Sequence, residues 1–240
     1  ATPGHIRATK KFGVFPVLAQ QSIREMARTS RSPQEVIDDV SWAVFQEGYQ
    51  RGFAADADHL KKEEEIDSTF KAGFTMYTID PSDYVDDNAD EYDVNTLKDK
   101  FARLPWGDLE CTSEDYFREY LGKEFELATE DEDYALKLSF SEEKLLRVAV
   151  KYSGAIAHAV RLKRHLEGLF HGGKFDMEVS VDETDTPTSP LEHFFIASEL
   201  KRLNVQTQGL ALRFVGRFEK AVDYIGNLEE FEKTFRDHVL

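Results

Sequence analysis

The chain has 240 residues, of which 41% are hydrophobic and 32% are charged, a composition typical of a soluble globular protein with one large or two small domains. Its net charge of −16 and pI ≈ 4.9 argue against nucleic acid or an anionic membrane surface as a partner. The single cysteine, Cys111, excludes an internal disulfide framework and predicts a reducing, cytoplasmic location.

Strand-like and helical patterns alternate over the first 80 residues. An apolar strand is predicted over 12–21, where it ends in two amides. A helix follows over 32–45, opened by the capping sequence SPQE. Next come a strand over 53–58, a charged helix over 62–72 that Gly73 closes, and a strand over 74–80. Such strand–helix units indicate parallel α/β packing.

Residues 85–140 mix acidic and aromatic residues without a clear alternation, which predicts an insertion or a lid-like subdomain. Ser141 is then expected to cap a long helix that reaches Leu166. His158 lies within this helix, and we interpret it as a hydrogen-bonded packing histidine rather than a ligand.

The strand–helix pattern resumes after this helix. It predicts strands over 175–181 and 210–215, and helices over 191–203 and 228–239. Five βα units with polar strand ends favour an α/β fold of the (β/α)8 TIM-barrel type, incomplete in this chain. The predicted parts are 1–84 and 141–240, which contain barrel units, and 85–140, which contains the insertion.

The ends of the chain support the same expectation. The sequence begins with Ala1-Thr2-Pro3 rather than with methionine, and it stops at Leu240 directly after a helical pattern. Both ends indicate a segment of a longer protein.

Polar side chains gather where the predicted strands end, and in barrels the active site is built from such strand ends. The stretch 53–61 (FAADADHLK) carries the densest group. His59 and Glu178 are the predicted ligands of a divalent metal, either Zn, Mn, Ni or Co. Two partners would neutralise Glu178 within its apolar strand, a metal ion or Arg213, and the spacing leaves both open.

Asp58 is the predicted catalytic base, with capping of the following helix as its alternative role. Asp182 and Glu183 offer a second catalytic acid or base at another strand end. No glycine-rich phosphate or dinucleotide motif follows a predicted strand, which removes the usual nucleotide-binding interpretation. Glutamines suited to sugar hydroxyls and cations suited to a carboxylate complete the predicted substrate site, which comprises Gln20, Gln21, Lys61, Asp80, Arg213 and Arg217.

Six strings carry a resemblance to a known family: FPVLAQQSIRE, SWAVFQEGY, GFAADADHLK, GFTMYTIDPSDYV, EVSVDETDTPTSP and LALRFVGRFEKAVDYIG. Together they resemble the tagaturonate epimerase family over nearly the whole chain. Members of that family act in sugar-acid catabolism and interconvert the ketouronates tagaturonate and fructuronate with a divalent metal. The resemblance implies a (β/α)8-type barrel, with Asp58 as catalytic acid or base and His59 and Glu178 at the metal.

The chain departs from the family pattern at both ends. Family members carry a further N-terminal region, and they continue into strands with a Leu-His-Ser-Gly-Ser-Asp-Lys motif and a Lys-Thr-Ala-Gly-Thr-Ser motif. The resemblance implies that the absent histidine binds the metal and that the absent lysines contact the substrate. The resemblance therefore implies that the barrel and its site are incomplete here, with the first strand and the last two barrel units missing.

The resemblance also implies a reaction at a carbinol one carbon beyond the position α to a ketone, for which retro-aldol opening and re-addition avoids an unstabilised carbanion. Two alternatives stay open: another metal-dependent sugar enzyme, such as an aldolase or a ketose isomerase, and a fragment that depends on a partner. The expected partners are a small sugar acid and either a second copy or a complementary chain segment, with no nucleic acid and no membrane.

Overall fold

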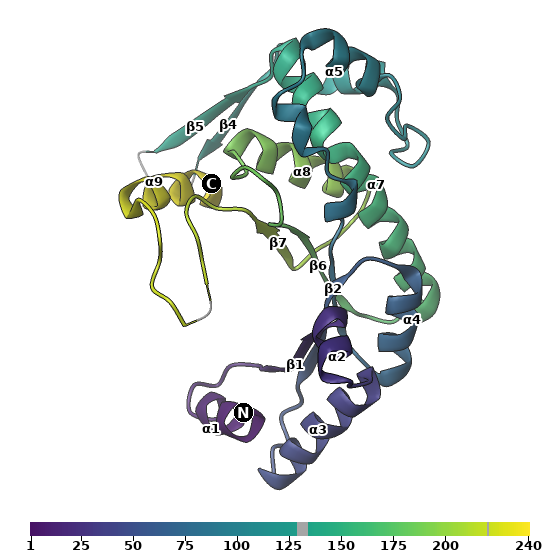
Figure 1. Cartoon of the computed structure of the whole chain (residues 1–240), viewed down its shortest axis with the longest axis vertical. Coiled ribbons are helices and arrows are strands. Elements are labelled where there is room, and N and C mark those ends of the chain that lie inside the picture. Colours follow the sequence, from purple (N-terminus) through teal and green to yellow (C-terminus); the bar gives the residue numbers. More distant parts are fainter. Residues whose placement is uncertain (129–133, 220) are drawn as a thin grey trace. The chain divides into compact units, whose positions relative to one another are not determined.

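The computed structural model describes residues 1–128, 134–219 and 221–240, and Figure 1 traces their elements. These residues form two compact units. The elements in chain order are α1 (Thr2–Thr9), β1 (Val17–Ser22), α2 (Ile23–Thr29), α3 (Pro33–Gln46), β2 (Ala54–Leu60), α4 (Glu63–Ala72), β3 (Met76–Ile79), η1 (Ser82–Tyr84), η2 (Asp87–Asp90), α5 (Val94–Phe101), α6 (Ser113–Tyr120), β4 (Glu124–Ala128), β5 (Ala135–Ser139), α7 (Glu142–Phe170), β6 (Asp176–Val181), α8 (Pro190–Arg202), β7 (Gly209–Leu212) and α9 (Leu228–Val239).

The main sheet has the strand order β1-β2-β3-β6-β7, and the pairs β1–β2, β2–β3 and β3–β6 are parallel. A separate antiparallel pair joins β4 to β5. The predicted α/β class is therefore confirmed. Unit 1 comprises residues 1–80, 162–180 and 207–209, and unit 2 comprises 81–161, 181–206 and 210–240. Each unit is assembled from separate stretches, whereas the three parts expected from the sequence are consecutive.

The predicted strands are present, and all but the one over 53–58 are shorter than expected. Pro16 has no N–H to donate, and strand β1 begins after it, at Val17 rather than at Phe12. Strand β7 stops at Leu212 because the backbone of Arg213 pairs elsewhere: its carbonyl accepts from the Thr188 amide at 2.8 Å.

In unit 1 the sheet has one apolar and one polar face, as the two-residue period of a strand dictates. Tyr77 and Met177 are opposite each other on the apolar face, where the Tyr77 ring packs edge-on against Phe170 of α7. On the other face, the Thr78 hydroxyl donates to Asp56 Oδ1 at 3.1 Å. The polar face, which carries Asp56 and Thr78, therefore lies on the side of the sheet opposite to this aromatic packing.

Helix boundaries in unit 1 follow the capping residues predicted from the sequence. Ser32 and Glu35 form a reciprocal capping box at the start of α3. Helix α4 ends at Gly73, whose φ of 94° suits a residue without a Cβ atom. At the start of α4, Glu65 Oε2 accepts from the amides of Lys61 and Lys62 at 2.7 and 3.1 Å.

Unit 2 contains the predicted insertion, apart from residues 129–133, which lie outside the described residues. Its core is an aromatic cluster in which the rings of Tyr116 and Tyr120 both contact Phe195 of α8. The Tyr120 hydroxyl donates to buried Glu199 at 2.6 Å. Aromatic residues that show no strand or helix period in the sequence thus form a core between α6 and α8. In the described part of the chain, no helix combines the length and apolarity of a membrane span.

Candidate functional site

The carboxyl end of β2 has an unusual backbone that brings two consecutive polar side chains together. The register with β3 shifts between Ala57 and Leu60, and His59 has a φ of 53° in the left-handed region. For a residue with a side chain this conformation costs roughly 1–3 kcal/mol, and such strain is concentrated at functional sites. It leaves Asp58 Oδ1 3.9 Å from His59 Nε2, although neighbours in a regular strand point to opposite faces.

Asp80, directly after β3, orients the His59 imidazole. Asp80 is 3% exposed, and its Oδ2 atom lies 3.2 Å from His59 Nδ1 and 3.7 Å from Lys61 Nζ. A carboxylate at Nδ1 favours the tautomer that carries its proton there, so that Nε2 presents its lone pair. The structure thus brings three residues predicted for the site, His59, Lys61 and Asp80, into one cluster. The alternative role of Asp58 as a helix cap is wrong, because the N-cap residue of α4 is Lys62, whose amide donates to Glu65.

Asp56 is a further member of this cluster, and the sequence interpretation counted it among the polar strand ends without giving it a role. It is 4% exposed, and burial raises its pKa to about 6, with a further increase from the charge of Asp58. The charge of Glu178 also raises this pKa, while the Thr78 hydrogen bond and the charge of His59 lower it. An acid of this strength exchanges its proton near neutral pH, as a general acid or base must. The available signal was the spacing Asp56-Ala-Asp58, which puts both carboxylates on one face of a strand.

Glu178 lies beside these residues within unit 1. It is opposite Thr78 in the β3–β6 register, on the polar face of the sheet. Its carboxylate packs over Gly209, where a Cβ atom would stand 2.5 Å from Glu178 Oε2. The place of Glu178 therefore depends on Gly209, the first residue of β7, which the sequence interpretation missed.

The two predicted amides at the end of β1 have different surroundings. Gln20 is exposed and pairs with Asp56 in the β1–β2 register. Gln21 pairs with Ala57, and its Oε1 atom accepts from Arg31 Nη1 at 3.0 Å. Gln20 is therefore the amide on the polar face, whereas Gln21 orients an arginine before α3.

A second cluster lies in unit 2. Asp182, Arg213 and Arg217 line a cavity of about 640 Å³ together with Phe214 and Phe218. Two arginines in the lining of one cavity suit a carboxylate ligand, because each guanidinium group can donate a bidentate pair of hydrogen bonds. The adjacent Glu183 is exposed.

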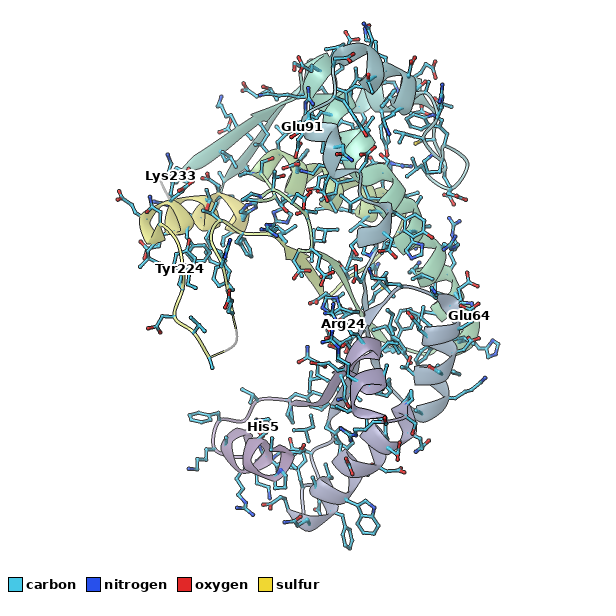
Figure 2. All side chains as sticks on the ribbon, viewed as in Figure 1. His5, Arg24, Glu64, Glu91, Tyr224 and Lys233 are labelled. Atoms are coloured by element: carbon cyan, nitrogen blue, oxygen red, sulfur yellow. The ribbon has the colours of Figure 1, made fainter. Side chains whose placement is uncertain are left out.

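The loop that carries Arg217 folds back on itself. The Arg217 and Ile225 backbones bridge, and the Tyr224 hydroxyl, labelled in Figure 2, lies 3.1 Å from the Val215 carbonyl oxygen. Gly216 makes room for this ring, since a Cβ atom there would stand 2.3 Å from the Tyr224 hydroxyl. The glycine thus allows the tight loop that brings Arg217 to the cavity.

His158 is a packing residue, as predicted. It is 3% exposed, stacks on the Tyr84 ring at 4.1 Å, and its Nδ1 atom accepts from Arg161 at 2.9 Å.

The donors in unit 1 fit a divalent metal in kind. Imidazole nitrogen and carboxylate oxygen suit Zn, Mn, Ni and Co, and the Asp80 contact at Nδ1 leaves Nε2 of His59 as the nitrogen with an available lone pair. In number they are insufficient: across residues 1–128, 134–219 and 221–240, no three His, Cys, Asp or Glu side chains are arranged to hold a metal ion.

Comparison with known proteins gives one consistent result. The family model described as UxaE, tagaturonate epimerase, matches residues 1–240. The tagaturonate/fructuronate epimerase of Thermotoga maritima is 45% identical over 237 residues, which are 99% of this chain and 46% of that protein. Crystal structures of fructuronate-tagaturonate epimerase UxaE from Cohnella laeviribosi, native and with glycerol, match with a TM-score of 0.86 and 39% identity.

The structural match covers 99% of this chain and 46% of the Cohnella chain. The chain therefore spans about half the length of the relatives that it matches. Since the family model extends over every residue, the chain belongs to the tagaturonate epimerase family.

Proposed function

We propose that this chain acts in the epimerisation of the ketouronates tagaturonate and fructuronate, a step of hexuronate catabolism. The observation that carries the proposal is the strained end of β2, where Asp58 lies next to an imidazole that Asp80 orients. Such a reaction needs a general base close to a group that can bind a metal ion, and Asp58 and His59 are suited to these two roles. Family membership supplies the substrate class.

The proposed chemistry is a retro-aldol reaction in which Asp58 is the base. Asp58 accepts the proton of the carbinol hydroxyl, the adjacent carbon–carbon bond breaks, and its electron pair passes to the ketone side as an enediolate. The new aldehyde rotates, and the bond forms again on its opposite face as a proton returns to the oxygen. The sequence predicts that Asp182 or Glu183 returns this proton, and this role stays a prediction.

His59 and Glu178 are the proposed ligands of a divalent metal, which when bound would stabilise negative charge on substrate oxygens. Asp80 would hold the imidazole in the coordinating tautomer. Lys61, near Asp80, supplies a positive charge suited to an anionic sugar acid. In unit 2, the cavity with Arg213 and Arg217 is a proposed carboxylate-binding site.

We further propose that the sheet belongs to a (β/α)8 barrel. The order β1-β2-β3-β6-β7 with its three parallel pairs supports this, as does the polar face that carries Asp56, Thr78 and Glu178. A cytoplasmic location is proposed from the single free thiol of Cys111. An experimental structure of the complete gene product would decide whether the sheet closes.

The decisive experiment is an epimerisation assay on the product of the complete gene, with metal analysis of the same samples. Wild-type protein should interconvert the two ketouronates. Asp58→Asn should abolish turnover and retain most of the metal, whereas His59→Ala should lose both. The control Asp38→Asn neutralises an exposed carboxylate on α3 and should change neither.

Each result has a defined meaning. Aldol cleavage products or ketose–aldose exchange without epimerisation would show another sugar enzyme and overturn the proposal. Full activity of Asp58→Asn would remove Asp58 from the mechanism, and unchanged metal content in His59→Ala would remove His59 from the metal site.

A further inference from the structure

Lys151, a buried lysine of unit 2, hydrogen-bonds to three separate segments and has no role in the proposed mechanism. It lies on α7 and is 1% exposed. Its Nζ atom donates to Asp90 Oδ2 at 2.7 Å, to Thr186 Oγ1 at 2.9 Å and to Glu192 Oε1 at 3.0 Å. A buried ammonium is costly unless it is paired, and three acceptors match its three N–H groups.

The lysine is not equipped to react with a carbonyl group. Burial lowers the pKa of Lys151, but the hydrogen bond that Lys151 donates to Asp90 and the charge of Glu192 outweigh this effect and raise the pKa above its ordinary value. A nucleophilic lysine needs a lowered pKa and access to the substrate, and Lys151 has neither. Its role must therefore come from what its partners hold.

Those partners fix the segment after β6, residues 182–189, which we call the 182–189 loop. The Thr186 hydroxyl accepts from Lys151 and donates to Asp90 Oδ2 at 2.8 Å. The neighbouring Asp185 amide donates to Asp87 Oδ1 at 3.2 Å. Two consecutive residues of the loop are thereby tied to η2.

The end of the loop is tied as well. Glu192 uses its second oxygen, Oε2, to accept from the Ser189 amide and hydroxyl at 2.6 and 2.7 Å, which caps α8. One carboxylate thus joins Lys151 to the last residue of the loop.

The 182–189 loop contributes one residue to the cavity lining and hydrogen-bonds to another residue that lines the cavity. Its first residue, Asp182, lines the cavity. Near its other end, the Thr188 amide donates to the Arg213 carbonyl at 2.8 Å, and the Arg213 amide donates to Thr188 Oγ1 at 3.3 Å. The loop therefore holds the backbone of a residue that also lines the cavity.

We propose that Lys151 is a positioning residue for this cavity: through Thr186 and Glu192 it fixes the 182–189 loop, which in turn places Asp182 and Arg213. The proposal rests on the proposed function only where the cavity is taken as the binding site of a sugar-acid carboxylate. Small displacements of substrate-binding groups have large kinetic effects, so a loosened loop should weaken substrate binding.

Thr186→Val tests the proposal in the complete gene product, because it keeps the shape of an exposed side chain and removes one hydroxyl. Thr186→Ser, which keeps the hydroxyl, is the matched control. In Thr186→Val, amide hydrogen exchange in the 182–189 loop and at Arg213 should speed up, and the KM for a ketouronate should rise roughly tenfold or more with a smaller change in kcat. Thr186→Ser should resemble the wild type.

Lys151→Arg and Lys151→Met extend the test to the lysine. Lys151→Arg should retain more of the loop protection than Lys151→Met, and if Lys151→Met does not fold, the threonine pair still decides. Unchanged exchange in Thr186→Val would overturn the proposal whatever the activity. Faster exchange with an unaltered KM would overturn it too. Faster exchange in a protein whose wild type lacks epimerase activity would contradict the proposed function and support the loop-fixing role.

Discussion

The Glu178 carboxylate occupies the space above the Cα atom of Gly209, where a Cβ atom would stand 2.5 Å from Oε2. Gly209→Ala should displace the end of this flexible side chain while leaving the backbone of β7 unstrained. We expect loss of metal and a large fall in turnover, with a melting temperature close to that of the wild type. Metal analysis, kinetics and thermal unfolding of the complete gene product measure the three quantities.

A matched glycine supplies the control for this variant. A Cβ atom at Gly168, on α7, would meet no atom within 4 Å. Gly168→Ala should leave metal content and turnover unchanged and stabilise the helix by about 0.5–1 kcal/mol. Wild-type metal content in Gly209→Ala would show that the position of Glu178 is not needed for the site.

Asp80→Asn should disturb the imidazole without touching the backbone. The amide replaces the anion that lies 3.2 Å from His59 Nδ1, so the favoured tautomer is no longer enforced. If His59 binds the proposed metal, metal affinity or turnover should fall roughly ten- to hundredfold, the effect typical of removing a partner of a metal-binding histidine. Nitrogen NMR of the His59 ring should report the tautomer change, and an unchanged spectrum would contradict the orienting role.

A pair of histidines predicts acid-sensitive packing of α9. His193 Nδ1 lies 3.2 Å from His238 Nδ1. Burial and the nearby His238 lower the pKa of His193 to about 4, and burial also lowers that of His238. Below about pH 6.5 the histidines of the unfolded chain bind protons, whereas the folded pair stays neutral. The contribution of the neutral pair to the free energy of unfolding is therefore complete above about pH 6.5. It should decline as the pH falls towards about 4.

Urea unfolding and hydrogen exchange of α9 between pH 7.5 and 4.5 measure this decline. His193→Gln should weaken the pH dependence relative to the wild type, since one of the two titrating groups is gone. The exposed His5 of α1, labelled in Figure 2, provides the control His5→Gln, which should keep the wild-type profile. Parallel profiles for the wild type and His193→Gln would exclude the pair as the origin.

Solvent deuterium separates the proposed retro-aldol reaction from direct deprotonation. In the retro-aldol reaction the inverted carbon keeps its own hydrogen, because only the hydroxyl proton and a carbon–carbon bond are exchanged. NMR of the product formed in deuterium oxide should therefore find no stable deuterium at that carbon. Deuterium there after turnover would sink the retro-aldol route and favour proton abstraction from carbon.

Much of the fold was predictable because it depends on local chemistry. The capping residues before α3 and the glycine after α4 set the helix ends, and both act within a few residues. The aromatic core of unit 2 was not predictable. Tyr120 and Phe195 lie far apart in the sequence, and an irregular spacing says nothing about such a contact.

The apolar spacing of α3 does not predict correctly which of its side chains are buried. Phe45 continues the apolar spacing of α3, yet it is 78% exposed, whereas Ala43 is buried. The side of a helix that is buried depends on the sheet against which it packs, and the chain pattern alone does not specify that sheet.

The candidate site divides in the same way. The amino-acid sequence by itself determined the α/β class, the family and the polar strand ends, including Asp58, His59 and Glu178. Only the tertiary structure decided that a left-handed His59 turns towards Asp80, that Asp56 is buried among charges, and that Glu178 rests on Gly209. The physical reason is that strain, desolvation and close approach arise between segments that meet only in the folded chain.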